Sequence, residues 1–155
     1  MSYFRQPRNV ELSVIHYIKE SIDSSWSNIT TIKSFTQAYN TTLPVVCIRL
    51  REFPSTRLEI GGNTLLYDYN IIIDIFANSE GQKLDLASFI IDKLKDGCVY
   101  YNFSQTSGAP ETMTKVADGR LHVKDFLSNT SLDFGEDAHK WDQHRWFLSL
   151  NMRTD

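Results

Sequence analysis

The fold is decided by Leu65-Leu66-Tyr67-Asp68-Tyr69-Asn70-Ile71-Ile72-Ile73-Asp74-Ile75-Phe76. Apolar and aromatic side chains occupy alternate positions of this stretch, namely Tyr67, Tyr69, Ile71, Ile73 and Ile75. The positions between them hold Asp68, Asn70, Ile72 and Asp74. Successive side chains of a β-strand point to opposite faces of the sheet. The stretch therefore predicts one long strand with an apolar face and a mixed, mainly polar face.

A second alternating segment precedes it at residues 45–53. There Val46, Ile48 and Leu50 alternate with Cys47, Arg49 and Arg51, which is the pattern of a half-exposed strand. Pro54 and the pair Gly61-Gly62 interrupt the connection to residue 65, which is too long for a tight hairpin turn. We predict an antiparallel pair, a long β-hairpin whose far ends project from the body of the domain.

Two helices are predicted beside this hairpin. The first spans residues 10–24, with Asn9 as its N-cap and an apolar stripe made by Val10, Val14, Ile15, Ile18 and Ile22. The second spans residues 79–96, where Ser79 and Gln82 form a capping-box pattern and Gly97 ends the helix. Its face toward the sheet is predicted to be Leu84, Ala87, Ile91 and Leu94.

The remaining segments complete one α+β domain over residues 1–155, with a mainly antiparallel sheet packed against the N-terminal and central helices. Further strands are predicted at 29–35, 99–103 and 121–127, and a closing strand at 144–153 with Trp146, Leu148, Leu150 and Met152 on one face. A long loop is expected at 104–120, where glycine and proline recur, and an acidic loop at 133–142. Loops of that length in compact domains are usually functional or disordered.

Composition limits the classes of function. The 155 residues carry a net charge of −3, which gives no general reason to expect sequence-specific nucleic-acid binding. No run approaches the ~18 apolar residues of a membrane helix, so we expect neither a secretory signal nor a membrane anchor, and a product of the cytoplasm. Cys47 and Cys98 are too few for a disulfide scaffold, and we expect two free, buried thiols.

Candidate chemistry is sparse. Two histidines and three carboxylates gather in one segment, at Glu136, Asp137, His139, Asp142 and His144. The two histidines are five positions apart, which does not fit the i, i+4 spacing of a helical zinc pair, so a solvated acidic turn is favoured. The segment Gly61-Gly62-Asn63 lacks the lysine of a phosphate loop and is interpreted as a turn. We expect no catalysis, no metal and no cofactor.

Charged residues on the hairpin are the candidate interaction site. Arg49, Arg51 and Arg57 form a basic stripe that could contact phosphates. Two acidic residues, Glu52 and Glu59, are interspersed among these arginines, which favours a solvated or intersubunit face instead.

Three central segments resemble the tail terminator (tail-completion) family of tailed bacteriophages. They are Leu58 to Gly62, Leu66 to Ala77, and the helix carrying Gln82 to Leu94. The likeness covers most of residues 9–103 and the last strand. It implies a homohexameric ring at the head-proximal end of the tail tube, which stops tube polymerisation and contacts the head–tail connector or stopper. It also implies a virion protein, assembled in the host cytoplasm, with the tail tube protein as a partner and no cofactor.

Alternatives stay open at this stage. Within the same structural class, one is a different neck component, such as a connector adaptor or stopper. Others are a nucleic-acid-binding accessory protein, which would show a basic face, and a small hydrolase, which would show a convergent polar pocket. For the ring, interface residues are expected on the hairpin, at Arg49, Arg51, Arg57 and Glu59, and in the loop 104–120.

Overall fold

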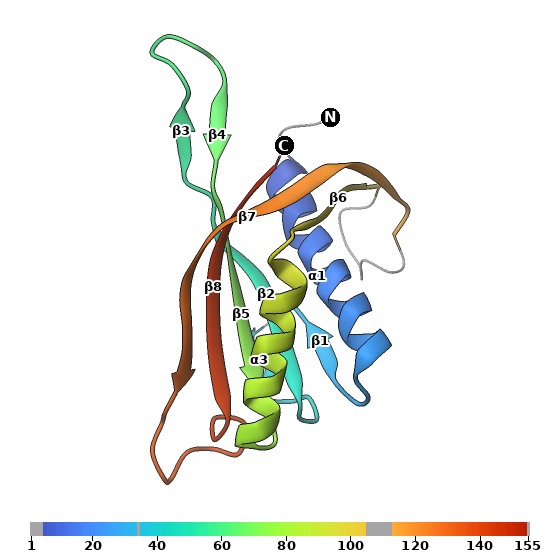
Figure 1. Ribbon diagram of the computed structural model, residues 1–155, viewed down its shortest axis with the longest axis vertical. Coiled ribbons are helices and arrows are strands. Elements are labelled where there is room, and N and C mark those ends of the chain that lie inside the picture. The colour runs from blue at the N-terminus through green and yellow to red at the C-terminus, as the bar shows by residue number, and fades with distance from the viewer. Residues whose placement is uncertain (1–4, 34, 105–112, 155) are drawn as a thin grey trace.

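The computed structural model describes residues 5–33, 35–104 and 113–154 (Figure 1). In this part the chain forms a single α+β domain with helices α1 (Gln6–Ser25), α2 (Phe35–Ala38) and α3 (Glu80–Leu94). The strands are β1 (Thr30–Ile32), β2 (Val45–Glu52), β3 (Ser55–Arg57), β4 (Leu65–Tyr67), β5 (Tyr69–Phe76), β6 (Cys98–Phe103), β7 (Lys115–Leu132) and β8 (Arg145–Thr154). The predicted fold class is confirmed.

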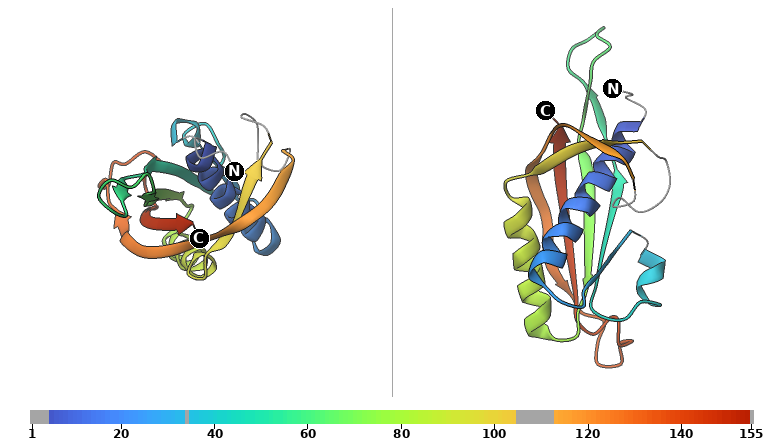
Figure 2. Two further views of the ribbon diagram at one scale, coloured as in Figure 1. Left: turned by 90° about the horizontal axis from the view of Figure 1, so that it is seen from above. Right: turned by 90° about the vertical axis from the view of Figure 1, so that its right-hand side faces the viewer.

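Six strands form one curled sheet in the order β1-β2-β5-β8-β7-β6, and β3 and β4 form a separate two-stranded sheet. All neighbours in the large sheet are antiparallel except β1 and β2. Helices α1 and α3 lie on the same, inner face of the curl (Figure 2). The main core between them is lined from the sheet by Val46, Ile48, Ile71, Ile73, Ile75, Leu148 and Leu150.

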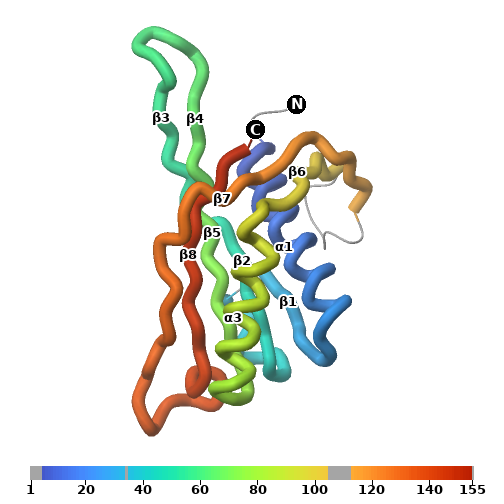
Figure 3. Tube along the Cα trace, in the orientation of Figure 1, coloured from blue at the N-terminus to red at the C-terminus, as the bar shows by residue number. Residues whose placement is uncertain are grey.

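The predicted antiparallel pairing is confirmed, but the strand predicted over 65–76 is divided at Asp68 into β4 and β5, and β4 pairs with β3 instead of with β2. Strands β2 and β5 pair antiparallel, with Val45 opposite Phe76 and Ile48 opposite Ile73. After a register shift between Leu50 and Glu52, the chain continues into β3 and β4, which project beyond the body of the domain (Figures 1 and 3). Gly61 sits at the tip with φ +83°, a conformation that favours glycine.

The first helix and the last strand meet at one end of the molecule. Helix α1 begins, and β8 ends, at the end of the domain from which β3 and β4 project (Figure 1).

The N-cap of α1 is Arg5, so the prediction of Asn9 as the cap is wrong. Asn9 lies inside the helix. Its side-chain Nδ2 donates to the Tyr100 hydroxyl at 3.2 Å, and its Oδ1 accepts a hydrogen bond from the backbone N–H of Phe103. A polar side chain near a helix start thus serves tertiary contacts instead.

The start and end of α3 follow the prediction, but its buried face differs. The Ser79 hydroxyl accepts a hydrogen bond from the Gln82 amide, and Gly97 follows the helix with φ +77°. Leu84, predicted to face the sheet, is 51% exposed. The buried positions are Lys83, Leu86, Ala87, Ile90 and Leu94.

This face was misassigned because apolar residues surround more than half of the helix, so their spacing does not fix its rotation. The observed rotation of the helix places Lys83 on the buried face. Its ammonium reaches the Glu80 carboxylate at 2.8 Å and the Ser131 hydroxyl at 2.8 Å, so the buried stem keeps its charge paired.

The predicted loop 104–120 is wrong in its second half. Residues 105–112 lie outside the described residues, but Lys115–Arg120 is the first part of β7 and pairs with β6. Strand β7 then continues to Leu132, five residues beyond the predicted end. Most of its side chains are exposed on both faces, so the sequence shows no alternation there.

The outer face of the sheet carries a second, smaller core. Strand β2 was predicted to be half exposed, yet Val45 and Cys47 are both buried beneath α2. The thiols of Cys47 and Cys98 are free and buried, as predicted. Burial raises the pKa of each thiol to about 12, which keeps both protonated near neutral pH.

A buried carboxylate protects the free part of the β2 edge. Strand β1 pairs with β2 only as far as Cys47. Beyond that point, the Leu50 amide donates to Oε2 of Glu11 at 2.8 Å, and Lys33 reaches Oε1 of Glu11 at 2.8 Å. Side-chain pairing of this kind satisfies a backbone donor that no strand covers.

We expect Glu11→Ala to lower the free energy of unfolding by about 1–3 kcal/mol, because the Leu50 amide loses its acceptor in a partly buried place. Urea denaturation measures the change. Glu20→Ala is the control, since Glu20 lies on the same helix with its side chain 75% exposed, and its effect should stay within about 0.5 kcal/mol. Equal effects of the two substitutions would contradict this role for Glu11.

Candidate interaction surface

The projecting part of the hairpin, residues 53–67, is here called the arm. It carries large apolar side chains in contact with solvent, namely Phe53, Leu58, Ile60 and Leu65. Ile60 at the tip is fully exposed, and Leu58 is 61% exposed. Single exposed apolar residues are common, but several on one projecting element mark an interaction site.

The predicted site residues all lie along this hairpin, in two groups. Arg49 and Arg51 are exposed residues of β2, and Arg51 lies at the register shift between Leu50 and Glu52. Arg57 and Glu59 lie in the arm, beyond the register shift.

Contacts differ among these four residues. The Arg49 guanidinium lies 5.4 Å from the centre of the Phe35 ring, and Arg57 donates to the Gly62 carbonyl oxygen across the turn. Neither Arg51 nor Glu59 forms a salt bridge with any residue in the described part of the chain. Their charges are available to a partner.

The acidic segment does not converge on one point. The Asp142 carboxylate accepts from the Tyr39 hydroxyl at 2.7 Å, and Nδ1 of His144 lies 3.0 Å from the Glu80 carboxylate. His139 instead stacks on the Trp141 indole, with ring centres 4.8 Å apart. Among residues 5–33, 35–104 and 113–154, no three His, Cys, Asp or Glu side chains are grouped to hold a metal ion.

A buried ion pair beneath this segment was not foreseen. The Asp74 carboxylate lies 3.1 Å from the Arg145 guanidinium, and both side chains are 4% exposed. Burial raises the pKa of Asp74, and the positive charge of Arg145 opposes that rise. Arg145 also reaches Asp142 at 3.2 Å, so the pair ties the acidic segment to the sheet. The alternation of β5 had placed Asp74 on a mainly polar face.

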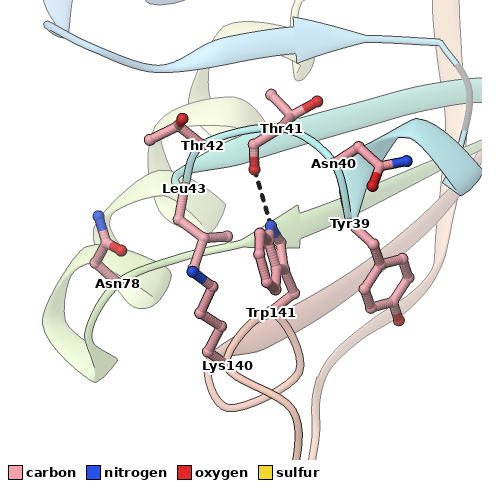
Figure 4. Close-up of a pocket in the computed structure, with 8 residues that line it drawn as sticks. All are labelled: Tyr39, Asn40, Thr41, Thr42, Leu43, Asn78, Lys140 and Trp141. Carbon is pink, nitrogen blue, oxygen red and sulfur yellow. Dashed lines mark hydrogen bonds between the residues drawn. The ribbon is translucent and has the colours of Figure 1, made fainter.

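One open pocket of about 550 Å³ lies next to the acidic segment (Figure 4). Two of its lining residues are joined by a hydrogen bond, in which the Trp141 indole donates to the Thr41 carbonyl oxygen at 2.9 Å. The lining residues are Tyr39, Asn40, Thr41, Thr42, Leu43, Asn78, Lys140 and Trp141. They include no His, Cys, Asp or Glu, the side chains that acid–base catalysis and metal binding use most.

The arm is therefore the part of the described surface whose residues point most clearly to an interaction. No described helix combines the length and the apolar character needed to cross a membrane. No model of a known protein family matches the chain. A comparison with curated protein sequences also finds no match.

Proposed function

We propose that this protein is a structural part of a phage virion. It forms a ring, of six copies by the family resemblance, at the head-proximal end of the tail tube. The ring stops tube polymerisation and joins the tail to the head–tail connector or stopper. The observation that carries the proposal is the arm, a projecting element with apolar and charged side chains that the core of the domain does not use.

The arm supports assembly for a physical reason. A two-stranded hairpin on its own is at best marginally stable in water, and β3 and β4 pair only with each other. Burying Leu58 and Ile60 against another subunit would stabilise the association by about 25 cal/mol for each Å² of apolar surface removed from water. An interaction between two different surfaces of identical subunits generates a ring when the rotation closes.

Arginines on β2 would help to orient a partner on the surface around the arm. Arg49 and Arg51 are exposed near the end of β2 that leads into the arm, and Glu59 lies within the arm. Alternating charges of this kind fix the register between partners and weaken wrong pairings. They suit contacts with a neighbouring subunit or with the tube protein.

Deleting the gene from its phage is expected to give tails without a defined end, seen as overlong tubes or as tails without heads in electron micrographs. Tails of normal length, attached to heads, would contradict the terminator role.

We expect the double substitution Arg49→Glu, Arg51→Glu to keep the fold and to impair capping, because both side chains are exposed. The variant is tested by complementing the deletion phage and measuring infectious yield and tail length. The control reverses Lys93 and Lys95 to Glu near the end of α3, which changes the net charge equally at a distance from the hairpin. Wild-type yield with the first variant would remove these arginines from the interface.

A further inference from the structure

Strand β7 leaves a long backbone edge without a strand partner. Strand β6 pairs with β7 only from Lys115 to Leu121, whereas β8 pairs with it as far as Leu132. From Val123 to Leu132, no other strand of the described part of the chain pairs with the second edge of β7. In Figure 1 this lower part of β7 forms the left-hand edge of the sheet, next to β8.

The upper portion of this edge is protected against pairing. Register shifts occur between Val123 and Asp125 and between Phe126 and Ser128, and Lys124 adds a charge there. Bulges and charged residues are the usual means by which proteins block an exposed strand edge.

The lower portion has neither a register shift nor a charge of its own, and its charged contact is the Lys83 ammonium at the Ser131 hydroxyl. From Ser128 to Leu132 the register with β8 is continuous, and the sequence is Ser-Asn-Thr-Ser-Leu, with no charge and no proline. We call residues 128–132 the open edge. An edge of this kind is a template for adding a strand from another chain.

Strand β3 of the arm also has one edge without a strand partner. Ser55, Thr56 and Arg57 of β3 are all exposed, and β3 pairs with β4 alone. A third strand would turn this marginal hairpin into part of a larger sheet. The arm cannot reach the open edge of its own chain, because the two lie toward opposite ends of the molecule (Figures 1 and 3).

We propose that β3 of one copy pairs with the open edge of β7 in a second copy. Charge complements the backbone pairing at one end, because Asp133 directly follows the open edge. Arg57 at the end of β3 would lie near this carboxylate when the two strands run parallel. Leu127 and Phe134, both 53% exposed, stand beside the open edge as apolar surface for the arm.

This inference rests on the proposed ring and names its subunit contact. The arm and the open edge are different surfaces, so each copy uses both and the contact passes from copy to copy. Such heterologous contacts close into a ring or continue as a filament.

Cross-linking tests the pairing directly. Thr56→Cys and Arg57→Cys place thiols on opposite faces of the arm, and each is mixed with Thr130→Cys and a short bismaleimide. The native thiols are buried, so they do not compete. We expect one of the two mixtures to give a cross-linked dimer, with much less in each variant alone. No dimer in either mixture, or a dimer from Thr130→Cys alone, overturns the pairing.

A charged residue on the open edge provides a second measurement. Thr130→Lys is expected to shift the protein to monomers in sedimentation velocity, whereas Ser24→Lys, at an exposed site on α1, should not. Unchanged association of Thr130→Lys, or a wild-type chain that is monomeric and gives no mixed cross-link, overturns the pairing. The tail length of the deletion phage judges the proposed function independently of these variants.

Discussion

Replacing Ile90 with Asp should abolish stable folding. Ile90 is 0% exposed and lies in the main core between α3, α1 and the sheet. An aspartate there would be ionised without a partner, or protonated without its usual solvation, and either state is costly. The expected loss is about 4 kcal/mol or more of the free energy of unfolding, which is a large part of the stability of a domain this size.

Leu84→Asp is the matched control on the same helix. Leu84 is 51% exposed, so the new charge stays in water and the change should lie within about 0.5 kcal/mol. Urea denaturation followed by circular dichroism measures both variants. Comparable midpoints for the two would mean that the buried face of α3 has been assigned wrongly.

Replacing Arg145 with Met should cost about 3–5 kcal/mol at neutral pH, because it leaves Asp74 buried without its counter-charge. Arg145 also contacts the Phe76 ring, with its guanidinium carbon 4.3 Å from the ring centre. The long methionine side chain keeps part of that packing, so the loss reports mainly on charge. Arg153→Met is the control, since its pair with Asp68 is partly exposed and worth about 0–1 kcal/mol.

Acid should reduce this cost. Burial raises the pKa of Asp74 above its value in the unfolded chain, so the folded state binds the proton more tightly. The stability contributed by Asp74 is therefore fully present below the unfolded pKa and is lost as pH rises through the folded pKa. Without Arg145 that pKa rises further, and the deficit of Arg145→Met relative to the parent should shrink as pH falls from 7 toward 4. A deficit that grows on acidification would contradict this assignment.

The hairpin and the limits of α3 could be predicted because local rules determine them. Alternation fixed β2 and β5, and the Ser79 hydroxyl and Gly97 marked the two ends of α3. The exposure of Arg49 and Arg51 was predicted correctly, although the register shift between Leu50 and Glu52 interrupts the alternation at Arg51.

Features that depend on distant segments could not be predicted. Cys47 and Asp74 are buried because α2 and the acidic segment cover the outer face of the sheet, and no local pattern reveals that cover. Strand β7 has no alternation because solvent reaches both of its faces.

The apolar arm and the open edge belong to this second group. The segment Ser128 to Leu132 combines Thr130, which strands favour, with Asn129, which they disfavour, so its composition does not identify a strand. That the segment is an edge follows only from the place where β6 stops pairing with β7. The full exposure of Ile60 likewise could not be predicted, because it depends on how far the arm projects from the domain.

The position of the chain ends has a practical consequence for anyone who purifies the protein. Because α1 begins and β8 ends beside the arm, an affinity tag fused to either terminus emerges where a neighbouring subunit would dock (Figure 1). A bulky tag there would obstruct assembly for steric reasons alone. The exposed turn at Ser27 and Asn28, where α1 leads into β1, lies across the molecule from the arm and is the better insertion site.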